Sequence, residues 1–219
     1  MVGNVGLTKP LAISRVYDLF QRLVGATHMR NWLSTHYWKL QAGNKILDIG
    51  CGPGTVVDLL PADITYVGFD VSESYIKTAR ERADARARFI VGSARDFLEQ
   101  PPDFMTDFDL VVCNGVLHHL NDAESADVLQ LARKVMAARG RFVCIEPVFL
   151  VHQGWFARWV MGLDRGLHVR TEREWKRIIG EVFPRFETNI ANSLLQIPYT
   201  HMIIECWRDR QLDPETMTS

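Results

Sequence analysis

A glycine-rich segment that follows a short apolar run carries the first chemistry in this sequence. Residues 45–49 predict a buried strand, and they lead directly into Gly50-Cys51-Gly52-Pro53-Gly54. Glycines let the backbone turn tightly and approach a ligand with no Cβ atom in the way. A helix is expected after the turn, and its exposed amides favour negative or electron-rich groups of a ligand. The segment therefore predicts a ligand site where the strand ends.

The glycine spacing differs from the usual dinucleotide fingerprint. That fingerprint requires glycine at position 55, where this chain has Thr55. The third glycine is instead Gly54, and an acid, Asp48, precedes the turn. An acid at this place suits a ligand that carries an ammonium and a sulfonium better than it suits a pyrophosphate. The alternative is a glycine-rich turn that binds nothing, because such a motif is weak when it stands alone.

A second acid, Asp70, ends the next predicted strand, 20 residues beyond Gly50. At this place a carboxylate can accept hydrogen bonds from both hydroxyls of a ribose. Two such charge-assisted hydrogen bonds contribute about 1.5–3 kcal/mol. The alternative is an N-cap for the helix that begins near Ser72. With the glycine turn at the right distance upstream, we favour ribose binding.

The elements that must position these residues alternate between strands and helices. Strands are predicted at 45–49, 64–69, 89–91, 108–113 and 142–145, and helices around 55–60, 72–85 and 122–138. Such alternation predicts parallel β-α-β units and a buried sheet. Two last strands, at 186–195 and 200–207, have no helix between them and predict an antiparallel pair at the sheet edge. The expected fold is α/β: a doubly wound, Rossmann-like, seven-stranded sheet, mostly parallel, with an antiparallel terminal hairpin.

The flanking segments complete a single expected domain over residues 1–219. Apolar residues at helical spacing between 11 and 40 predict two helices that form a partial lid. Thr171 and Glu174 have the spacing of a capping box and predict a helix over 171–179. Within the domain we expect a helical lid at 10–42, a cofactor-binding core at 43–147, and substrate-side helices with the terminal hairpin at 148–207.

Composition excludes several classes of protein. The chain has 25 basic and 26 acidic residues, a net charge of -1, which gives no support to binding of nucleic acid or an anionic membrane. The four cysteines are far apart and form no C-x-x-C pair, so no metal is expected. Reduced thiols and the absence of a signal-like N-terminus predict a cytoplasmic protein. The most apolar stretch, 148–163, is interrupted by polar residues and falls short of a membrane span.

Four segments together resemble the class I S-adenosylmethionine-dependent methyltransferases, most closely their broad small-molecule group. These segments are Asp48–Gly54, Asp70, Val91–Asp96 and Asp109–Leu120, within a resemblance that covers about residues 40 to 146. The resemblance implies S-adenosylmethionine as cofactor and S-adenosylhomocysteine as product. In that family the glycine turn meets the methionine and ribose part, and the acid after the second strand holds the ribose.

The segment after the third strand lies along the adenine in that family. Many members have an acid where this chain has Ser93, so the contact to the adenine amino group is expected to be weaker or to come from Asp96. The cofactor-binding residues that the resemblance implies are Asp48, Gly50, Cys51, Gly52, Gly54, Asp70, Val71, Ser93, Ala94, Arg95, Asn114, Gly115, Val116 and His119.

His118 and His119 are the candidates for acid–base chemistry. They follow the fourth strand, at the carboxyl edge where ligands bind in open α/β folds. Imidazole titrates near neutral pH, and a general base contributes about 10²–10⁴-fold when an acceptor must lose a proton. Adjacent residues point in different directions, so we expect at most one, His118 before His119, to face a substrate. Similar proteins carry this pair with varied acceptors, which favours the alternative of packing beside the cofactor.

The methyl acceptor is expected between the N-terminal helices and the segment after the fifth strand. One face of a predicted helix carries Trp155, Phe156, Trp159, Val160 and Leu163, and we expect most of them to pack on the core. Three potential cations in 164–170 suggest an acceptor that carries a carboxylate, a phosphate or a sugar, with a solvated polar loop as the alternative. The candidate acceptor-side residues are Trp32, His36, His152, Arg165, His168, Arg170 and Tyr199.

The sequence thus predicts methyl transfer to a small molecule, with O- or N-methylation favoured. A nicotinamide-dependent oxidoreductase is the first alternative, although the glycine spacing and the terminal hairpin argue against it. A non-catalytic protein that binds S-adenosylmethionine is the second, and no feature of the sequence excludes it. A nucleic-acid methyltransferase is disfavoured, because Asn114-Gly115-Val116-Leu117 stands where a D-P-P-Y-like tetrad would be needed.

Overall fold

The computed structural model describes residues 26–151, 153–162, 167–192, 194–195 and 199–208. Seven strands form one continuous sheet in the order β3-β2-β1-β4-β5-β8-β7, and the short β6 (Arg170–Thr171) pairs with β5 outside this path. The strands are β1 (Lys45–Ile49), β2 (Thr65–Asp70), β3 (Ala87–Val91), β4 (Phe108–Asn114), β5 (Met136–Phe149), β7 (Arg185–Ala191) and β8 (His201–Trp207). The strands β1 to β5 run parallel, whereas β8 is antiparallel to both β5 and β7. The predicted seven-stranded, doubly wound fold is confirmed, with β6 as an addition.

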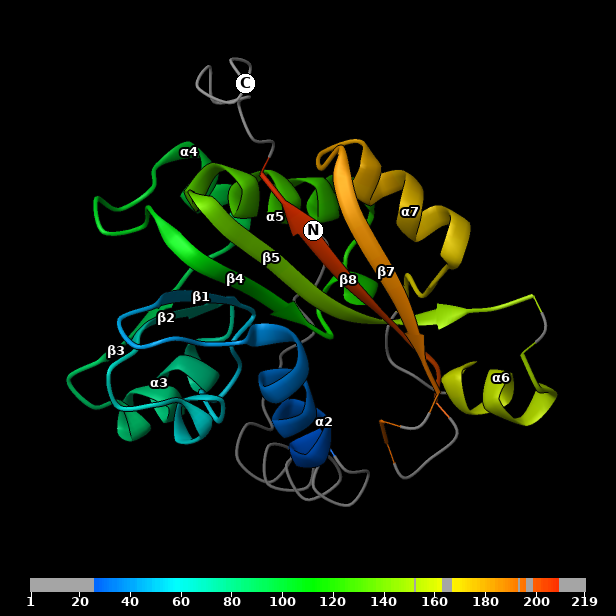
Figure 1. The fold of residues 1–219 in the computed structure, drawn as a ribbon, viewed down its shortest axis with the longest axis horizontal. Helices are drawn as coiled ribbons and strands as arrows, with labels where there is room; N and C mark the ends of the chain where they lie inside the picture. Colours follow the sequence, from blue (N-terminus) through cyan, green and yellow to red (C-terminus); the bar gives the residue numbers. More distant parts are fainter. Residues whose placement is uncertain (1–25, 152, 163–166, 193, 196–198, 209–219) are drawn as a thin grey trace, which may run out of the picture.

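Helices cover both faces of the sheet (Figure 1). The α4 (Ala94–Glu99), α5 (Asp122–Val135) and α7 (Glu172–Gly180) helices pack on one face, whose core includes Val111, Leu129 and Trp175. The α2 (Ala26–Leu33) and α3 (Glu73–Arg82) helices cover the other face around Ile46 and Ile76. Because the central strands are buried on both sides, their sequences are nearly continuous apolar runs. The first expected N-terminal helix lies largely outside the described residues, and the second corresponds to α2 and the π-helical turn η1 (Ser34–Trp38).

Three elements differ from the sequence prediction. The helix expected at 55–60 is a single 3-10 turn, η2 (Val57–Leu59), because Leu60 precedes Pro61 and is extended with ψ of 143°. The short α4 was not predicted, although Ser93 and Asp96 form a capping box at its start. The fifth strand is longer than the expected 142–145 and continues through Pro147 to Phe149.

Pro147 is tolerated in β5 because of where β4 stops. The pairing of β4 with β5 ends at Asn114 and Ile145, so the missing N–H of Pro147 leaves no bond of that ladder unmade. The next residue, Val148, donates its N–H to the Thr200 carbonyl on the β8 side. The Pro147 carbonyl accepts a hydrogen bond of 2.9 Å from the Trp175 indole of α7. The strand extension thereby reaches β6 and the segment on which acceptor contacts are expected.

The α6 helix (Trp155–Gly162) stands at the end of β5 rather than over the middle of either face (Figure 1). Trp155 is 81% exposed and Trp159 is 58% exposed. The expectation that most residues of this apolar helix face pack on the core is therefore wrong for these two. None of the described helices combines the length and apolar character that crossing a membrane requires.

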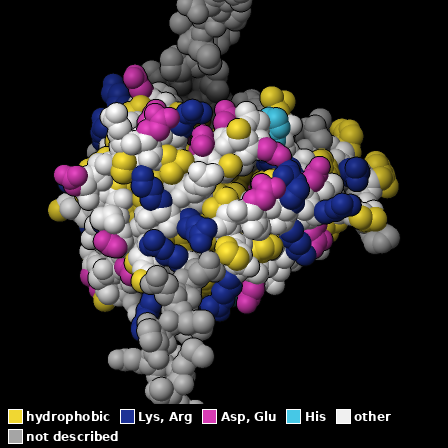
Figure 2. All heavy atoms as spheres, turned by 90° about the horizontal axis from the view of Figure 1, so that it is seen from above, with side chains coloured by type: hydrophobic (Ala, Val, Ile, Leu, Met, Phe, Trp, Pro, Cys, Tyr) yellow, Lys and Arg dark blue, Asp and Glu magenta, His cyan; other side chains and the backbone are white. Residues whose placement is uncertain are grey.

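Charges of both signs share the face that carries α5 and α7. Seen from above, the Lys and Arg side chains on this face lie among Asp and Glu side chains (Figure 2). Arg177 of α7 bridges Asp122 and Glu181, and Lys176 pairs with Glu172. Basic and acidic side chains are therefore intermixed on this face, and several of them form ion pairs.

Candidate functional site

A cavity of about 1260 Å³ opens where β1, β2 and β4 end. Its walls come from the glycine turn, the start of α3, the start of α4, the loop after β4 and the first turns of α5. The structure brings almost all predicted cofactor residues together in this one cavity: Asp48, Gly50, Cys51, Gly52, Asp70, Val71, Ser93, Ala94, Arg95, Asn114, Gly115, Val116 and His119.

Gly54 is the exception, since it does not line the cavity. All three glycines of the turn have positive φ: 71° at Gly50, 54° at Gly52 and 71° at Gly54. A Cβ atom at Gly54 would lie 2.7 Å from the Phe89 ring. The third glycine therefore allows close packing of the turn against β3. This is a structural requirement rather than a ligand contact.

Gly50 sits at a closer junction, between the turn and the loop after β4. A Cβ atom at Gly50 would lie 2.5 Å from Cγ2 of Val116, so any larger residue would force the two loops apart. The amides of Gly50 and Cys51 both donate to the Phe69 carbonyl, at 2.8 and 3.0 Å. These bonds tie the turn to the end of β2, where Asp70 follows.

The Asp70 carboxylate connects the turn to the next helix. Oδ2 accepts the Gly52 N–H at 3.0 Å, and Oδ1 accepts the Ser72 N–H at 2.8 Å. The N-cap of α3 is Ser72, whose hydroxyl accepts from the amide of Tyr75, so Asp70 is not the cap. Each carboxylate oxygen has two acceptor positions and uses one. Asp70 thus keeps acceptor capacity on both oxygens where it faces the cavity.

Asp48 is a buried acid in the wall of the same cavity. It is 2% exposed, and its Oδ2 accepts a hydrogen bond of 2.6 Å from the Tyr66 hydroxyl. Burial raises the pKa of Asp48 to about 7, while the Tyr66 hydrogen bond and the positive charge of Arg30 act in the opposite direction. A positively charged ligand group beside this carboxyl would favour its ionised form.

Ser93 and Asp96 form the start of α4, which contributes to another wall of the cavity. The Asp96 carboxylate accepts from the Ser93 amide and hydroxyl, and these bonds lower the pKa of Asp96. Asp96 is therefore engaged in capping and does not line the cavity, whereas Ser93 does. The expectation that Asp96 replaces the missing acid in the adenine contact is not supported by this arrangement.

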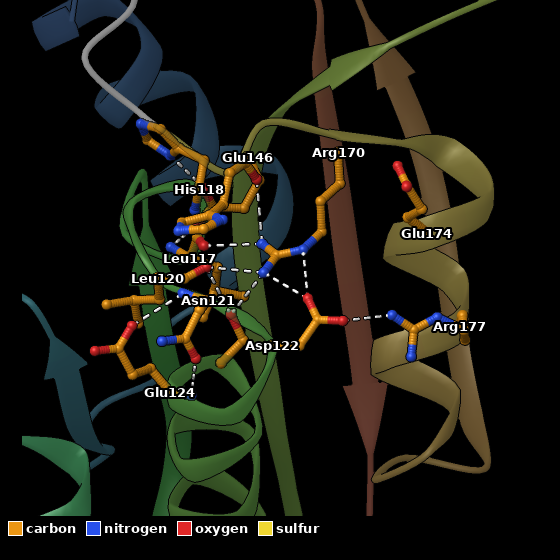
Figure 3. Close-up of polar contacts among 12 residues, drawn as sticks. Leu117, His118, Leu120, Asn121, Asp122, Glu124, Glu146, Arg170, Glu174 and Arg177 are labelled. Atoms are coloured by element: carbon orange, nitrogen blue, oxygen red, sulfur yellow. Dashed lines mark hydrogen bonds and ion pairs between the residues drawn. The ribbon is translucent and has the colours of Figure 1, made fainter.

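The two histidines have different environments. His118 is 6% exposed, and its Nδ1 lies 2.7 Å from Oε2 of the fully buried Glu146 (Figure 3). His119 lines the cavity, and its ring centroid lies 3.9 Å from that of His118. The histidine ranked first as a general base is thus held in the wall, and the one ranked second faces the cavity.

Of the candidate acceptor-side residues that the structure describes, none lines this cavity. Trp32 and His36 stack on each other, with ring centroids 4.6 Å apart. Tyr199 is 8% exposed, and its ring lies 4.9 Å from that of His201. Two further candidates, His152 and Arg165, lie outside the described residues.

Arg170 and His168 contact the loop after β4 instead of the cavity. Arg170 is 6% exposed and donates to the Leu117 and Leu120 carbonyls. The His168 amide donates to the His118 carbonyl at 2.9 Å. The prediction that Arg170 contacts the acceptor is therefore corrected: its guanidinium is occupied by the protein itself. The case for an anionic acceptor loses one of its three cations.

Several residues that line the cavity had not been predicted from the sequence. Asn121 and Glu124 form a capping box at the start of α5, and both line the cavity. Their N-x-x-E spacing, directly after the histidine pair, is a signal that could have placed this helix end at the site. Arg30 also lines the cavity from α2. The contact of Tyr66 with Asp48 could not have been predicted, because an aromatic residue within an apolar strand is typical of core packing.

Comparison with known proteins matches the middle of the chain to a methyltransferase domain. Residues 47–142 match a family model described as "Methyltransferase domain". A ubiquinone biosynthesis O-methyltransferase of Thiobacillus denitrificans is 33% identical over 88 residues, which are 38% of this chain and 37% of that protein. The 27-O-demethylrifamycin SV methyltransferase of Amycolatopsis mediterranei is 35% identical over 108 residues, 47% of this chain and 38% of that protein. The chain thus spans well under half the length of these two curated relatives.

Solved structures share the fold over most of the chain. A TehB-like SAM-dependent methyltransferase from Corynebacterium glutamicum aligns with a TM-score of 0.61 at 22% identity, covering 90% of this chain and 99% of that one. The plantazolicin methyltransferase BpumL, solved with a substrate analogue and SAH, aligns with a TM-score of 0.66 at 14% identity and covers 90% of each chain. Residues 47–142 therefore match a methyltransferase domain, and the likeness to these solved methyltransferases shows that the chain shares their fold.

Proposed function

We propose that this protein transfers the methyl group of S-adenosylmethionine to a small-molecule acceptor. The observation that carries the proposal is the pairing of Asp48 and Asp70 around a positive-φ glycine turn in one cavity, within the matched methyltransferase segment. The donor set fits the cofactor. A buried carboxyl suits the ammonium group, and a carboxylate with spare acceptor capacity on both oxygens suits the ribose hydroxyls.

The protein's own task in such a reaction is alignment and exclusion of water. The cofactor supplies a methyl carbon activated by a positive sulfur, so the acceptor needs only to be held in line with it. Asp48, Asp70 and the backbone of the glycine turn would fix the cofactor. The loop after β4, through Asn114 and Gly115, would pass its methionine part.

We favour a hydroxyl group as the acceptor. The names of both curated relatives specify transfer to oxygen, which supports an O-methylated product here more than an N-methylated one. A hydroxyl must lose its proton as the methyl group arrives, and a base near neutral pKa assists that step. His119 is the proposed base, because it faces the cavity. His118, whose ring packs against that of His119, belongs to the wall of the cavity.

The histidine assignment is tested by His119→Gln and His118→Gln in a methyl-transfer assay, once an acceptor is found. A general base predicts a loss of about 10²–10⁴-fold in kcat for His119→Gln, with S-adenosylhomocysteine affinity nearly unchanged. His118→Gln should weaken cofactor binding instead, since it disturbs the wall. A His119→Gln enzyme with the wild-type kcat would exclude this role.

The cofactor assignment is tested by calorimetric titration of S-adenosylhomocysteine into wild type and Asp70→Ala. We expect micromolar binding that weakens tenfold or more in the variant, or about 1.4 kcal/mol. Asp63→Ala, which changes an exposed acid outside the cavity, is the matched control and should bind as wild type does. Absence of binding to folded wild type would remove the proposal and favour the nicotinamide-dependent alternative.

A screen of phenols, alcohols and amines then separates the enzyme from a non-catalytic cofactor-binding protein. Formation of S-adenosylhomocysteine that depends on one acceptor class supports methyl transfer and identifies the methylated atom. Tight cofactor binding with no product from any acceptor would favour the non-catalytic alternative.

A further inference from the structure

The loop of residues 115–121, between β4 and α5, forms one wall of the cofactor cavity. Residues 115, 116 and 119–121 line it, and the loop includes both histidines. Val116 also lies directly against Gly50, because a Cβ atom added to that glycine would come within 2.5 Å of the valine side chain. The conformation of this loop therefore determines the shape of the cavity and the position of the residues against which the glycine turn packs.

The 115–121 loop has little regular structure of its own, so other groups must hold it. The Glu146 carboxylate, three residues before the end of β5, accepts hydrogen bonds from the loop's amides. Oε1 accepts from Val116 at 3.0 Å and Leu117 at 2.9 Å, and Oε2 accepts from His118 at 3.2 Å. Glu146 is 0% exposed, so these bonds replace its water. A buried carboxylate left without them would be strongly unfavourable.

Arg170 donates hydrogen bonds to carbonyls of the same loop. Its Nη1 donates to the Leu117 carbonyl at 3.0 Å, and its Nη2 donates to the Leu120 carbonyl at 2.8 Å (Figure 3). Nη1 also donates to the His168 carbonyl, and Nε and Nη2 both donate to Asp122, which follows the loop at the start of α5. One guanidinium thus joins the middle of the loop to its last turn and to the start of α5.

Arg170 is itself held rigidly. It belongs to β6, its neighbour in register on β5 is Val148, and its guanidinium lies 4.8 Å from the Trp175 ring centroid. It is 6% exposed and is not among the residues that line the cavity. The rigid fork of arginine can bridge several carbonyls at once, which a lysine ammonium on a flexible stem does less well.

We infer that Arg170 is a positioning residue that sets the affinity for the cofactor from outside the cofactor cavity. Together with Glu146, it fixes the 115–121 loop in the conformation that closes the cavity against the glycine turn. It also joins this loop to the 167–171 segment, on which the acceptor side was expected. The inference rests on the proposed function for the identity of the ligand, but the loop-holding role is independent of it.

The experiment compares Arg170→Met and Arg170→Lys with a matched control, Arg177→Met. Arg177 binds the same Asp122 carboxylate through a hydrogen bond of 2.6 Å, but it is half exposed, and its other ion pair joins it to Glu181 within α7 and the turn that follows. Titration with S-adenosylhomocysteine should give a Kd at least tenfold weaker for Arg170→Met and about threefold to tenfold weaker for Arg170→Lys. Arg177→Met should stay within twofold of wild type.

Hydrogen exchange of the ligand-free proteins provides the second readout. Loss of the Arg170 contacts should speed exchange in peptides covering 115–121, while peptides of β1 and β2 keep their wild-type rates. A general loss of stability would instead speed exchange everywhere. If Arg170→Met does not fold, Arg170→Lys is measured alone.

Wild-type affinity and wild-type exchange in folded Arg170→Met, or in Arg170→Lys if only that variant folds, would overturn the inference. A uniform rise in exchange would also overturn it, because the role would then be structural. If wild type fails to bind S-adenosylhomocysteine, the proposed function fails, and the exchange measurement still decides whether Arg170 holds the loop.

Discussion

At the scale of residues, two acids in one cavity differ in environment and therefore in use. Asp70 accepts hydrogen bonds from two backbone amides and keeps acceptor positions for neutral hydroxyls. Asp48 has one phenol as hydrogen-bond donor, and its burial raises its pKa to about 7. A group with this pKa is divided between its two forms near neutrality, so Asp48 should respond both to a cationic ligand and to pH.

The titration of Asp48 predicts pH-dependent cofactor binding. The carboxyl ionises above its pKa of about 7, and only the ionised form attracts an ammonium group. Affinity for S-adenosylhomocysteine should therefore rise with pH, by about tenfold between pH 6 and pH 8. Calorimetric titrations at the two pH values measure this change.

Asp48→Asn is the control, because the ligand's own titration is the same for both proteins and cancels. Its affinity should be lower and nearly independent of pH. Tyr66→Phe removes a hydrogen bond that lowers the Asp48 pKa, so its midpoint should move to higher pH. Equal wild-type affinities at pH 6 and pH 8 would contradict the assignment.

At the scale of elements, the sequence predicted what depends on local pattern. The apolar run before the glycine turn, the capping box of Thr171 and Glu174, and the terminal hairpin all appear as expected. Local pattern gave a wrong strand end where the extent of the neighbouring strand determines which residues pair. A proline such as Pro147 ordinarily predicts the end of a strand, but this one lies beyond the end of β4 and costs no ladder bond. The extent of β4 relative to β5 cannot be read from either strand alone.

The candidate site divides in the same way. Residues on the carboxyl ends of predicted strands were placed correctly in one cavity, because the parallel fold fixes where those ends meet. Arg170 was misplaced because its sequence neighbourhood is that of a polar loop. Its burial depends on carbonyls about fifty residues away, at Leu117 and Leu120. Hydrogen bonds between a side chain and backbone carbonyls so far away in the sequence produce no pattern that the sequence shows.

At the scale of the whole molecule, the cavity draws on both layers of the fold. Asp48 and Asp70 stand on strands between the layers, α2 contributes Arg30 from one face, and α5 contributes Asn121 and Glu124 from the other. A ligand in this cavity contacts segments that would separate when the protein unfolds. Its binding should therefore stabilise the domain as a unit rather than one loop.

This arrangement predicts a large thermal shift with S-adenosylhomocysteine. At a concentration 100 times Kd, a ligand that binds only the folded state contributes about 2.7 kcal/mol. For a domain of this size, that raises Tm by about 5–10 °C, measurable by differential scanning fluorimetry. NADH at the same concentration is the matched ligand control. It should leave Tm unchanged, because the position that the dinucleotide fingerprint requires as glycine is Thr55 and an acid precedes the turn. A shift with NADH and none with S-adenosylhomocysteine would reverse the assignment of the cavity, since each ligand can stabilise only the state that binds it.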